Sequence, residues 1–171
     1  MRRTLFFALV CTCLVSVRTS SGAPAPAAAA IAPAKTVDLS GSWVLDVARS
    51  DFGPGAKSTP RWRRDVIRHR GAVLHVRPQM VKVDGDTTHM EYTYRTDGKD
   101  AVNQVMNQPV HTTGRWKGSV LELVSNVRVM TATFLMTERW SLADAGRTLV
   151  IERESDSPLG KRRRRMLYHR E

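Results

Sequence analysis

From Val37 onward, apolar and polar residues alternate with a period of two, and this pattern limits the possible folds more than any other feature. In the first such segment, Trp43, Leu45 and Val47 share one face. Turn residues recur about every eight to twelve positions, and no stretch carries a helical period. We therefore predict an all-β domain, a single up-and-down antiparallel meander of about 8–10 strands, because closing such a sheet into a barrel leaves no exposed edge.

Turn residues divide the domain into its predicted strands. Asp97-Gly98 predicts a two-residue hairpin turn, since both residue types favour the positive φ angles of a type I′ turn. The segment 49–60 is rich in Gly and Pro and predicts a long surface loop. The predicted strands are 43–48, 65–69, 72–77, 89–95, 101–107, 111–116, 120–130, 131–142, 147–154 and 164–170.

The N-terminal segment carries targeting signals rather than fold signals. Arg2 and Arg3 precede a continuous apolar run over 4–17, which is too short to span a bilayer comfortably. Ser21 and Ala23 are the small residues that a signal-peptidase site requires. We therefore expect a signal peptide over 1–23, an extended Ala/Pro linker over 24–36, a domain over 37–171, and a secreted or periplasmic location.

A lipoprotein anchor and an uncleaved membrane anchor are the alternatives to this cleavage. Cys11 and Cys13 lie in the middle of the apolar run, which disfavours lipidation, and no stop-transfer pattern follows it. Both cysteines of the chain lie inside the predicted signal. The mature domain therefore has no thiol for a disulfide, a nucleophile or a metal ligand.

The positive charge of the chain is concentrated in two places. The chain has 27 Lys and Arg residues against 16 Asp and Glu. One of the two places is the run 161–165. We expect at least its first residues to form a protruding loop, which could dock on anionic lipid head groups or acidic polysaccharide or could simply be solvated. No aromatic residue is interleaved with that run, so we expect no nucleic-acid binding. One basic cluster is Arg61, Arg63, Arg64, Arg68 and Arg70; the other is the run Lys161, Arg162, Arg163, Arg164 and Arg165.

The common catalytic and cofactor motifs are missing from the sequence. It contains no Gly-x-Ser-x-Gly elbow, Walker loop, dinucleotide fingerprint or His-Glu-x-x-His helix, and we expect no cofactor. The five histidines are scattered, and His69 with His75 is the only close pair. Because no third ligand can be named for that pair, we expect no metal site.

Several segments carry a resemblance to a known family. The segment 39–46 reads LSGSWVLD and is followed by SDFGP at 50–54; YRTDGK, ERWSL and GRTLVI follow later in the chain. The domain thus resembles small secreted bacterial proteins of the lipocalin-like, calycin-type β-barrel family, which has no settled activity. Gly41-x-Trp43 is also similar to the motif of true lipocalins, which implies that Trp43 closes one barrel end and that a late arginine such as Arg170 packs across it.

If the sheet closes, alternation assigns one face of each strand to the interior. Aromatic rings with polar tips suit a pocket that holds an apolar molecule and fixes it with a few hydrogen bonds. The same pattern would serve a core filled by its own side chains, so both interpretations stay open. The candidate ligand-binding residues are Trp43, Met90, Tyr92, Tyr94, Trp116, Phe134, Met136, Glu138, Trp140 and Tyr168.

Glu138 is a charged residue on this inward face. It shares its parity with Phe134, Met136 and Trp140. A buried carboxylate is costly unless paired, so a regular strand implies a partner such as Arg115 or Arg170, or a ligand cation. Glu138 could orient a bound ligand, form a structural salt bridge near the rim, or turn to solvent at a bulge.

Three functions follow, in order of preference. The first is a non-catalytic binding protein for a small, largely apolar molecule, which we expect to be a monomer. The second is an interaction module that docks on anionic surfaces through its Arg-rich loop. The third is a small barrel enzyme of the isomerase or cyclase type, with Glu138 or Tyr92 as the acid or base.

Overall fold

A computed structural model describes residues 37–54, 59–129, 132–157 and 160–171. The predicted signal peptide (1–23) and linker (24–36) lie outside the described residues. Within the described part, no helix is long and apolar enough to cross a membrane. The elements are β1 (Gly41–Leu45), β2 (Trp62–Arg70), β3 (Val73–Val81), β4 (Thr87–His89), β5 (Tyr92–Arg95), β6 (Asp97–Val105), β7 (Gln108–Lys117), β8 (Val120–Val129), β9 (Ala132–Ala143), the 3-10 turn η1 (Asp144–Gly146), β10 (Thr148–Ser157) and β11 (Gly160–Arg170).

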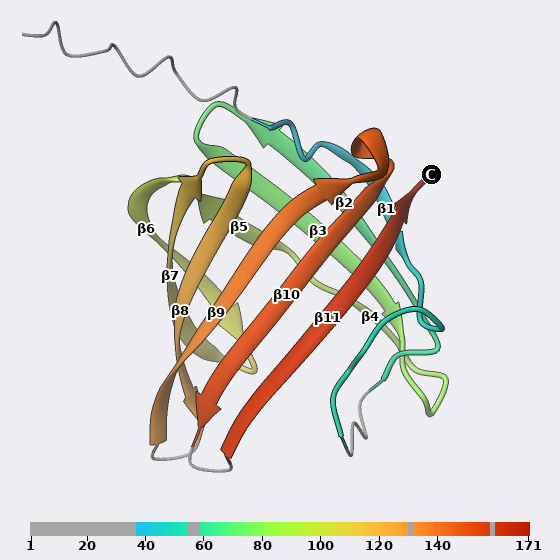
Figure 1. The fold of residues 1–171 in the computed structure, drawn as a ribbon. Helices are drawn as coiled ribbons and strands as arrows, with labels where there is room; N and C mark the ends of the chain where they lie inside the picture. The colour runs from blue at the N-terminus through green and yellow to red at the C-terminus, as the bar shows by residue number, and fades with distance from the viewer. Residues whose placement is uncertain (1–36, 55–58, 130–131, 158–159) are drawn as a thin grey trace, which may run out of the picture. The chain divides into compact units, whose positions relative to one another are not determined.

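The strands form one antiparallel sheet in which most strands pair with their neighbours in the sequence. The order is β4-β3-β2-β1-β11-β10-β9-β8-β7-β6, and β5 pairs with β3. β1 pairs with both β2 and β11, so the first and last strands lie side by side, and the sheet curls back on itself (Figure 1). The predicted all-β class and the up-and-down meander are confirmed.

A side chain joins β5 to β6, where the two ends of the sheet meet. The Asn103 side chain on β6 accepts a hydrogen bond from the Thr93 backbone N–H (2.8 Å) and donates one to the Thr93 carbonyl (2.9 Å). Gly114 on β7 also approaches β5 closely, since a Cβ atom there would lie 2.3 Å from the Arg95 carbonyl oxygen. A side-chain amide and a glycine therefore bring the curled sheet together.

The prediction of a single strand over 89–95 is wrong. β4 ends at His89 and β5 begins at Tyr92, although both pair with β3. Between them, the Met90 N–H still donates to the Pro78 carbonyl (3.0 Å). The break divides one predicted strand into two, and the sheet formed by the described residues has 11 strands.

The predicted hairpin turn at Asp97-Gly98 is also wrong. Both residues lie in β6, where the pairing with β7 shifts register. Gly98 has a φ of 81°, and a Cβ atom there would lie 2.6 Å from the guanidinium carbon of Arg115. The positive φ of Gly98 therefore belongs to an irregular stretch of β6 against which the Arg115 side chain packs. The left-handed pair that makes the β6–β7 turn is Met106-Asn107, with φ angles of 51° and 62°.

The first residues of the basic run, which we predicted to form a protruding loop, lie in a strand. β11 begins at Gly160 and pairs with β10 along the whole basic run. The second half of β10 places Glu152, Glu154 and Asp156 directly opposite Arg165, Arg163 and Lys161, respectively. Opposite charges across two strands stabilise the pairing and offset the repulsion along β11.

The two ends of the barrel are filled differently. At the end that holds the C-terminus, Leu39 and Trp43 are completely buried, and the Arg170 guanidinium lies 4.3 Å from the centre of the Trp43 ring. The arrangement that the lipocalin motif implies is therefore present. Toward the other end, where β11 begins, Phe134 and Met136 are only half-buried. We call these the closed end and the open end.

Candidate functional site

A cavity of about 270 Å³ lies inside the barrel. This volume lies just below the range of small-molecule pockets, which measure roughly 300–1,000 Å³. The barrel is therefore not completely filled by its own side chains. The candidate residues that line the cavity are Met90, Tyr92, Tyr94, Met136, Glu138, Trp140 and Tyr168.

Aromatic rings form one apolar wall of this cavity. The rings of Tyr92 and Tyr94 stack with their centres 6.2 Å apart, and Trp140 meets Tyr94 edge-on at 6.0 Å. Met90 lies at the same wall and accepts a hydrogen bond from the Tyr92 hydroxyl at its sulfur (3.0 Å). Such packed pairs hold each other in place, so the wall is shaped before any ligand arrives.

Glu138 faces inward and is buried, as its parity predicts. Its carboxylate pairs with the Arg153 guanidinium on β10 and accepts a hydrogen bond from the Trp140 indole N–H (3.0 Å). The predicted partners are wrong: Arg115 is exposed, and Arg170 packs on Trp43 at the closed end. The charge of Glu138 raises the pKa of Arg153 and keeps this guanidinium protonated inside the barrel.

A second ion pair lies on β2 beside the cavity. Arg63 on β2 makes two 2.8 Å hydrogen bonds to the carboxylate of Asp65, which is completely buried. Arg63 lines the cavity, and its guanidinium also lies 5.9 Å from the centre of the Tyr168 ring. The sequence interpretation missed Arg63, Asp65 and Arg153. The alternation of residues along each strand could have identified them. Arg63 and Asp65 share a strand face with the buried Ile67 on β2, and Arg153 shares one with the buried Ile151 on β10.

The phenol groups of the cavity are hydrogen-bond donors at ordinary pH. Burial raises the pKa of Tyr94 and Tyr168 far above the usual value, and it raises the pKa of Tyr92 in the same direction. The Tyr168 hydroxyl is buried and has no hydrogen-bond partner among the described residues. An unsatisfied buried hydroxyl costs free energy, so a ligand acceptor placed against it would gain a hydrogen bond.

Three of the predicted ligand-binding residues do not line the cavity. Trp43 fills the closed end. Trp116 packs its ring on that of His69, with the centres 5.9 Å apart. Phe134 lies one inward position beyond Met136 on β9, toward the open end.

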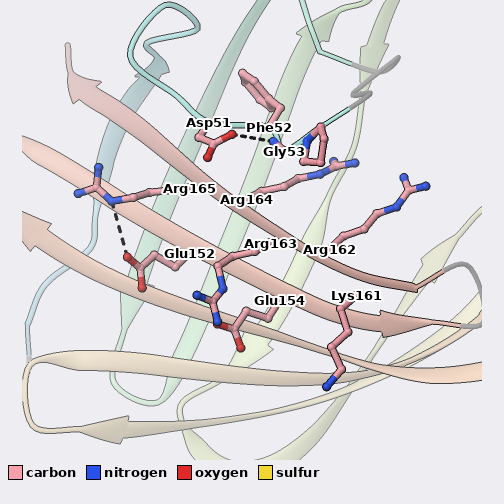
Figure 2. Close-up of a pocket in the computed structure, with 11 residues that line it drawn as sticks. Asp51, Phe52, Gly53, Glu152, Glu154, Lys161, Arg162, Arg163, Arg164 and Arg165 are labelled. Atoms are coloured by element: carbon pink, nitrogen blue, oxygen red, sulfur yellow. Dashed lines mark hydrogen bonds and ion pairs between the residues drawn. The ribbon is translucent and has the colours of Figure 1, made fainter.

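The residues of the basic run fall on two faces of β11. Figure 2 shows Arg162 and Arg164 leaving the strand on the side opposite to Lys161 and Arg163. Lys161, Arg163 and Arg165 point outward and lie 3.5 Å, 3.0 Å and 3.6 Å from carboxylate oxygens of β10. Much of the positive charge of the run is therefore compensated on the outer surface of the barrel.

The histidines do not form a metal centre. His69 and His75 lie on opposite faces of the β2–β3 hairpin, since His69 is nearly buried and His75 is exposed. Within the described ranges, no group of three His, Cys, Asp or Glu side chains could hold a metal ion.

Comparison with known proteins gives structural matches and no sequence match. No protein-family model and no curated protein matches the chain. Among solved structures, it is similar to the wild-type fluorescent protein UnaG (14% identity, covering 78% of this chain and 97% of that one, TM-score 0.53). It is also similar to zebrafish ileal bile acid-binding protein complexed with cholic acid (10%, 77% and 98%, 0.53) and to an abundant heat soluble protein of Ramazzottius varieornatus (13%, 78% and 95%, 0.55).

At these identities the likeness concerns the fold. Together with the antiparallel order and the Trp43–Arg170 closure, it shows that the chain has a lipocalin-like β-barrel fold. The lipocalin-like fold that the sequence resemblance implies is confirmed.

Proposed function

We propose that the protein binds one small, largely apolar molecule in the barrel cavity and releases it unchanged. The observation that carries this proposal is the cavity itself, a space of about 270 Å³ walled by aromatic rings and methionines. Burial of apolar ligand surface supplies the affinity, at roughly 0.8 kcal/mol per buried methylene. The zebrafish neighbour, a bile acid-binding protein complexed with cholic acid, supports the use of this fold for such a ligand.

Binding without chemistry agrees with the state of the cavity carboxylate. Glu138 is engaged by Arg153 and by the Trp140 indole, so its carboxylate oxygens are occupied by structural contacts. Tyr92 keeps its proton because burial raises its pKa. We therefore assign these groups to the shape of the cavity wall rather than to catalysis.

The test fills the cavity without changing the outer surface. Val110 lines the cavity and is buried, whereas Val102 is exposed on the outer face of the neighbouring strand. We expect Val110→Phe to weaken the binding of an apolar fluorescent probe at least about tenfold. The reason is that the cavity volume and ligand contacts it removes are worth more than about 1.4 kcal/mol of binding free energy. Val102→Phe is the matched control and should bind as the native protein does.

Two results would refute the binding function. One is equal probe affinity in Val110→Phe and the native protein, with both shown to be folded by circular dichroism. The other is native mass spectrometry of protein purified from its source that finds no co-purified molecule, together with no measurable binding of apolar probes.

We also propose that the protein works outside the cytoplasm, because the N-terminal sequence has the organisation of a cleaved signal. N-terminal sequencing of the protein from its native compartment should give a chain that starts at Pro24. A chain that retains Met1 and stays in the cytoplasm would contradict this.

A further inference from the structure

Arg162 and Arg164 are the cations of the basic run that have no carboxylate to face. In the part of the chain that the structure describes, neither side chain lies within ion-pair distance of an acidic group, in contrast to Lys161, Arg163 and Arg165. Arg164 is also half-buried, so its charge is not simply solvated. A half-buried cation without a counter-charge costs free energy that a bound anion would recover.

These two arginines continue the inner face of β11 beyond the cavity. Alternate residues of a strand share a face, and Tyr168 and Met166 line the cavity on this one. Arg164 and Arg162 follow at steps of roughly 7 Å along the strand. Arg164 is the direct cross-strand neighbour of Arg153, which also lines the cavity. The face therefore runs from an apolar interior to a cationic rim at the open end.

An apolar segment borders the same rim. Phe52 and Pro54 line a groove of about 610 Å³ together with the basic run and the outer Glu152 and Glu154 (Figure 2). Phe52 also packs against the hydrophobic core. A backbone bridge between Asp51 and Arg165 holds the segment in place, with both hydrogen bonds at 2.8 Å. A molecule at the rim thus meets guanidinium groups and hydrocarbon together.

We propose that the cavity ligand is an amphiphile with one anionic head group, bound with its tail among Tyr94 and Trp140 and its head against Arg162 and Arg164. This inference rests on the proposed function, because it assigns the chemical class and the direction of the ligand in the same cavity.

The charges inside the barrel favour the outward direction of the head. Arg153 already pairs with Glu138, and Arg63 already pairs with Asp65. An anion placed deep in the cavity would meet the carboxylate of Glu138, which lines it. At the rim, burial and the positive charges of Arg153 and Arg162 disfavour the charged form of Arg164 and lower its pKa. An anionic head therefore relieves repulsion at the rim and would create it in the interior.

The test compares decanoate with its uncharged analogue decanol by calorimetric titration of the purified protein. We expect the native protein to prefer decanoate. Arg162→Gln/Arg164→Gln should weaken decanoate binding about tenfold, because it removes charge-assisted hydrogen bonds, and should leave decanol binding unchanged. The matched control is Arg163→Gln/Arg165→Gln, which removes the same charge from the same strand but on the outer face.

The direction of the ligand gives a second readout. Nuclear Overhauser contacts from the terminal methyl of decanoate should reach the rings of Tyr94 or Trp140. Methyl contacts with Phe52 would put the head inside the barrel and overturn the inference.

Equal loss of decanoate affinity in the two double variants would mean that the net charge of the protein, and not the position of Arg162 and Arg164, causes the loss. This result would also overturn the inference. If decanol binds but decanoate has no advantage that depends on Arg162 and Arg164, the head-group inference fails and the binding function stands. If neither compound nor any apolar probe binds the native protein, both fail.

Discussion

The closed end and the open end of this barrel are built for different purposes. At the closed end, Trp43 is completely buried, donates its indole N–H to the Leu39 carbonyl (3.0 Å) and is covered by Arg170. Arg170 in turn donates to the Ser40 carbonyl (2.8 Å). The contacts join the segment before β1 to the last strand, so this end ties the two ends of the domain together.

The open end has the opposite character. Its inward residues Phe134 and Met136 are half-buried, and its arginines Arg162 and Arg164 lack acidic partners among the described residues. Packing and satisfied hydrogen bonds supply most of the stability of a fold, and a binding entrance needs groups left without partners. The comparison indicates that the closed end carries more of the stability, and under the proposed function the open end is where the ligand enters.

The largest expected effect comes from emptying the closed end. Trp43→Ala should lower the free energy of unfolding by about 3–5 kcal/mol, because it leaves a large cavity and removes the surface on which Arg170 packs. Phe134→Ala at the open end should cost less than half as much, since Phe134 is half-exposed. Urea unfolding followed by circular dichroism measures both. Similar losses for the two variants would mean that the ends do not differ in stability.

The next effect comes from the charge pair between the two ends. Arg153→Met should cost about 2 kcal/mol, because it leaves Glu138 buried without a counter-charge. The cost stays below that of a fully buried pair, since 30% of the Arg153 side chain is exposed. Adding Glu138→Leu should restore most of the stability, and a double-mutant cycle measures this coupling. A double variant that is less stable than Arg153→Met would contradict the pairing as the cause.

The hydrogen bonds that join β5 to β6 should have a smaller and more local effect on stability. Asn103→Ala removes both hydrogen bonds to the Thr93 backbone, at a cost of about 1.5 kcal/mol. Hydrogen exchange should become faster at Thr93 and the neighbouring β5 amides and stay unchanged in β10 and β11. The matched control is Gln104→Ala, on the exposed face of the same strand. Uniformly faster exchange would mean that these hydrogen bonds have no local role.

The sequence was sufficient for the fold class because alternation along strands is a local property. Trp43, Tyr94, Trp140 and Tyr168 follow the predicted parity, and the same parity placed Glu138 inside. The Asp97-Gly98 prediction failed because a glycine with positive φ serves a tight turn and an irregular strand equally well. Only the packing of Arg115 on Gly98 distinguishes the two.

The candidate site was only partly predictable because its charges depend on pairing between strands. Nothing local to Arg153 shows that it lies opposite Glu138, and nothing local to Lys161 shows that it lies opposite Asp156. A run of five basic residues therefore predicted a protruding loop at its first residues, either solvated or docked on an anionic surface. Register places three of these cations opposite carboxylates on the outer face and leaves two at the rim of the inner face without acidic partners among the described residues.

The smallest expected effect is a pH dependence at the bend between β5 and β6. Arg95 donates two hydrogen bonds to the Asp97 carboxylate, and this holds the pKa of Asp97 at about 2, below its ordinary value of 3.8. A lowered pKa means that the pair stabilises the fold above pH 3.8, and that this contribution is lost as the pH falls toward 2. Because the carboxylate is exposed, the pH dependence of unfolding should barely change, whereas an NMR titration of the Asp97 carboxyl should give the low pKa directly. Arg95→Gln should return that pKa to near 3.8, and an unchanged titration would show that the ion pair does not form in solution.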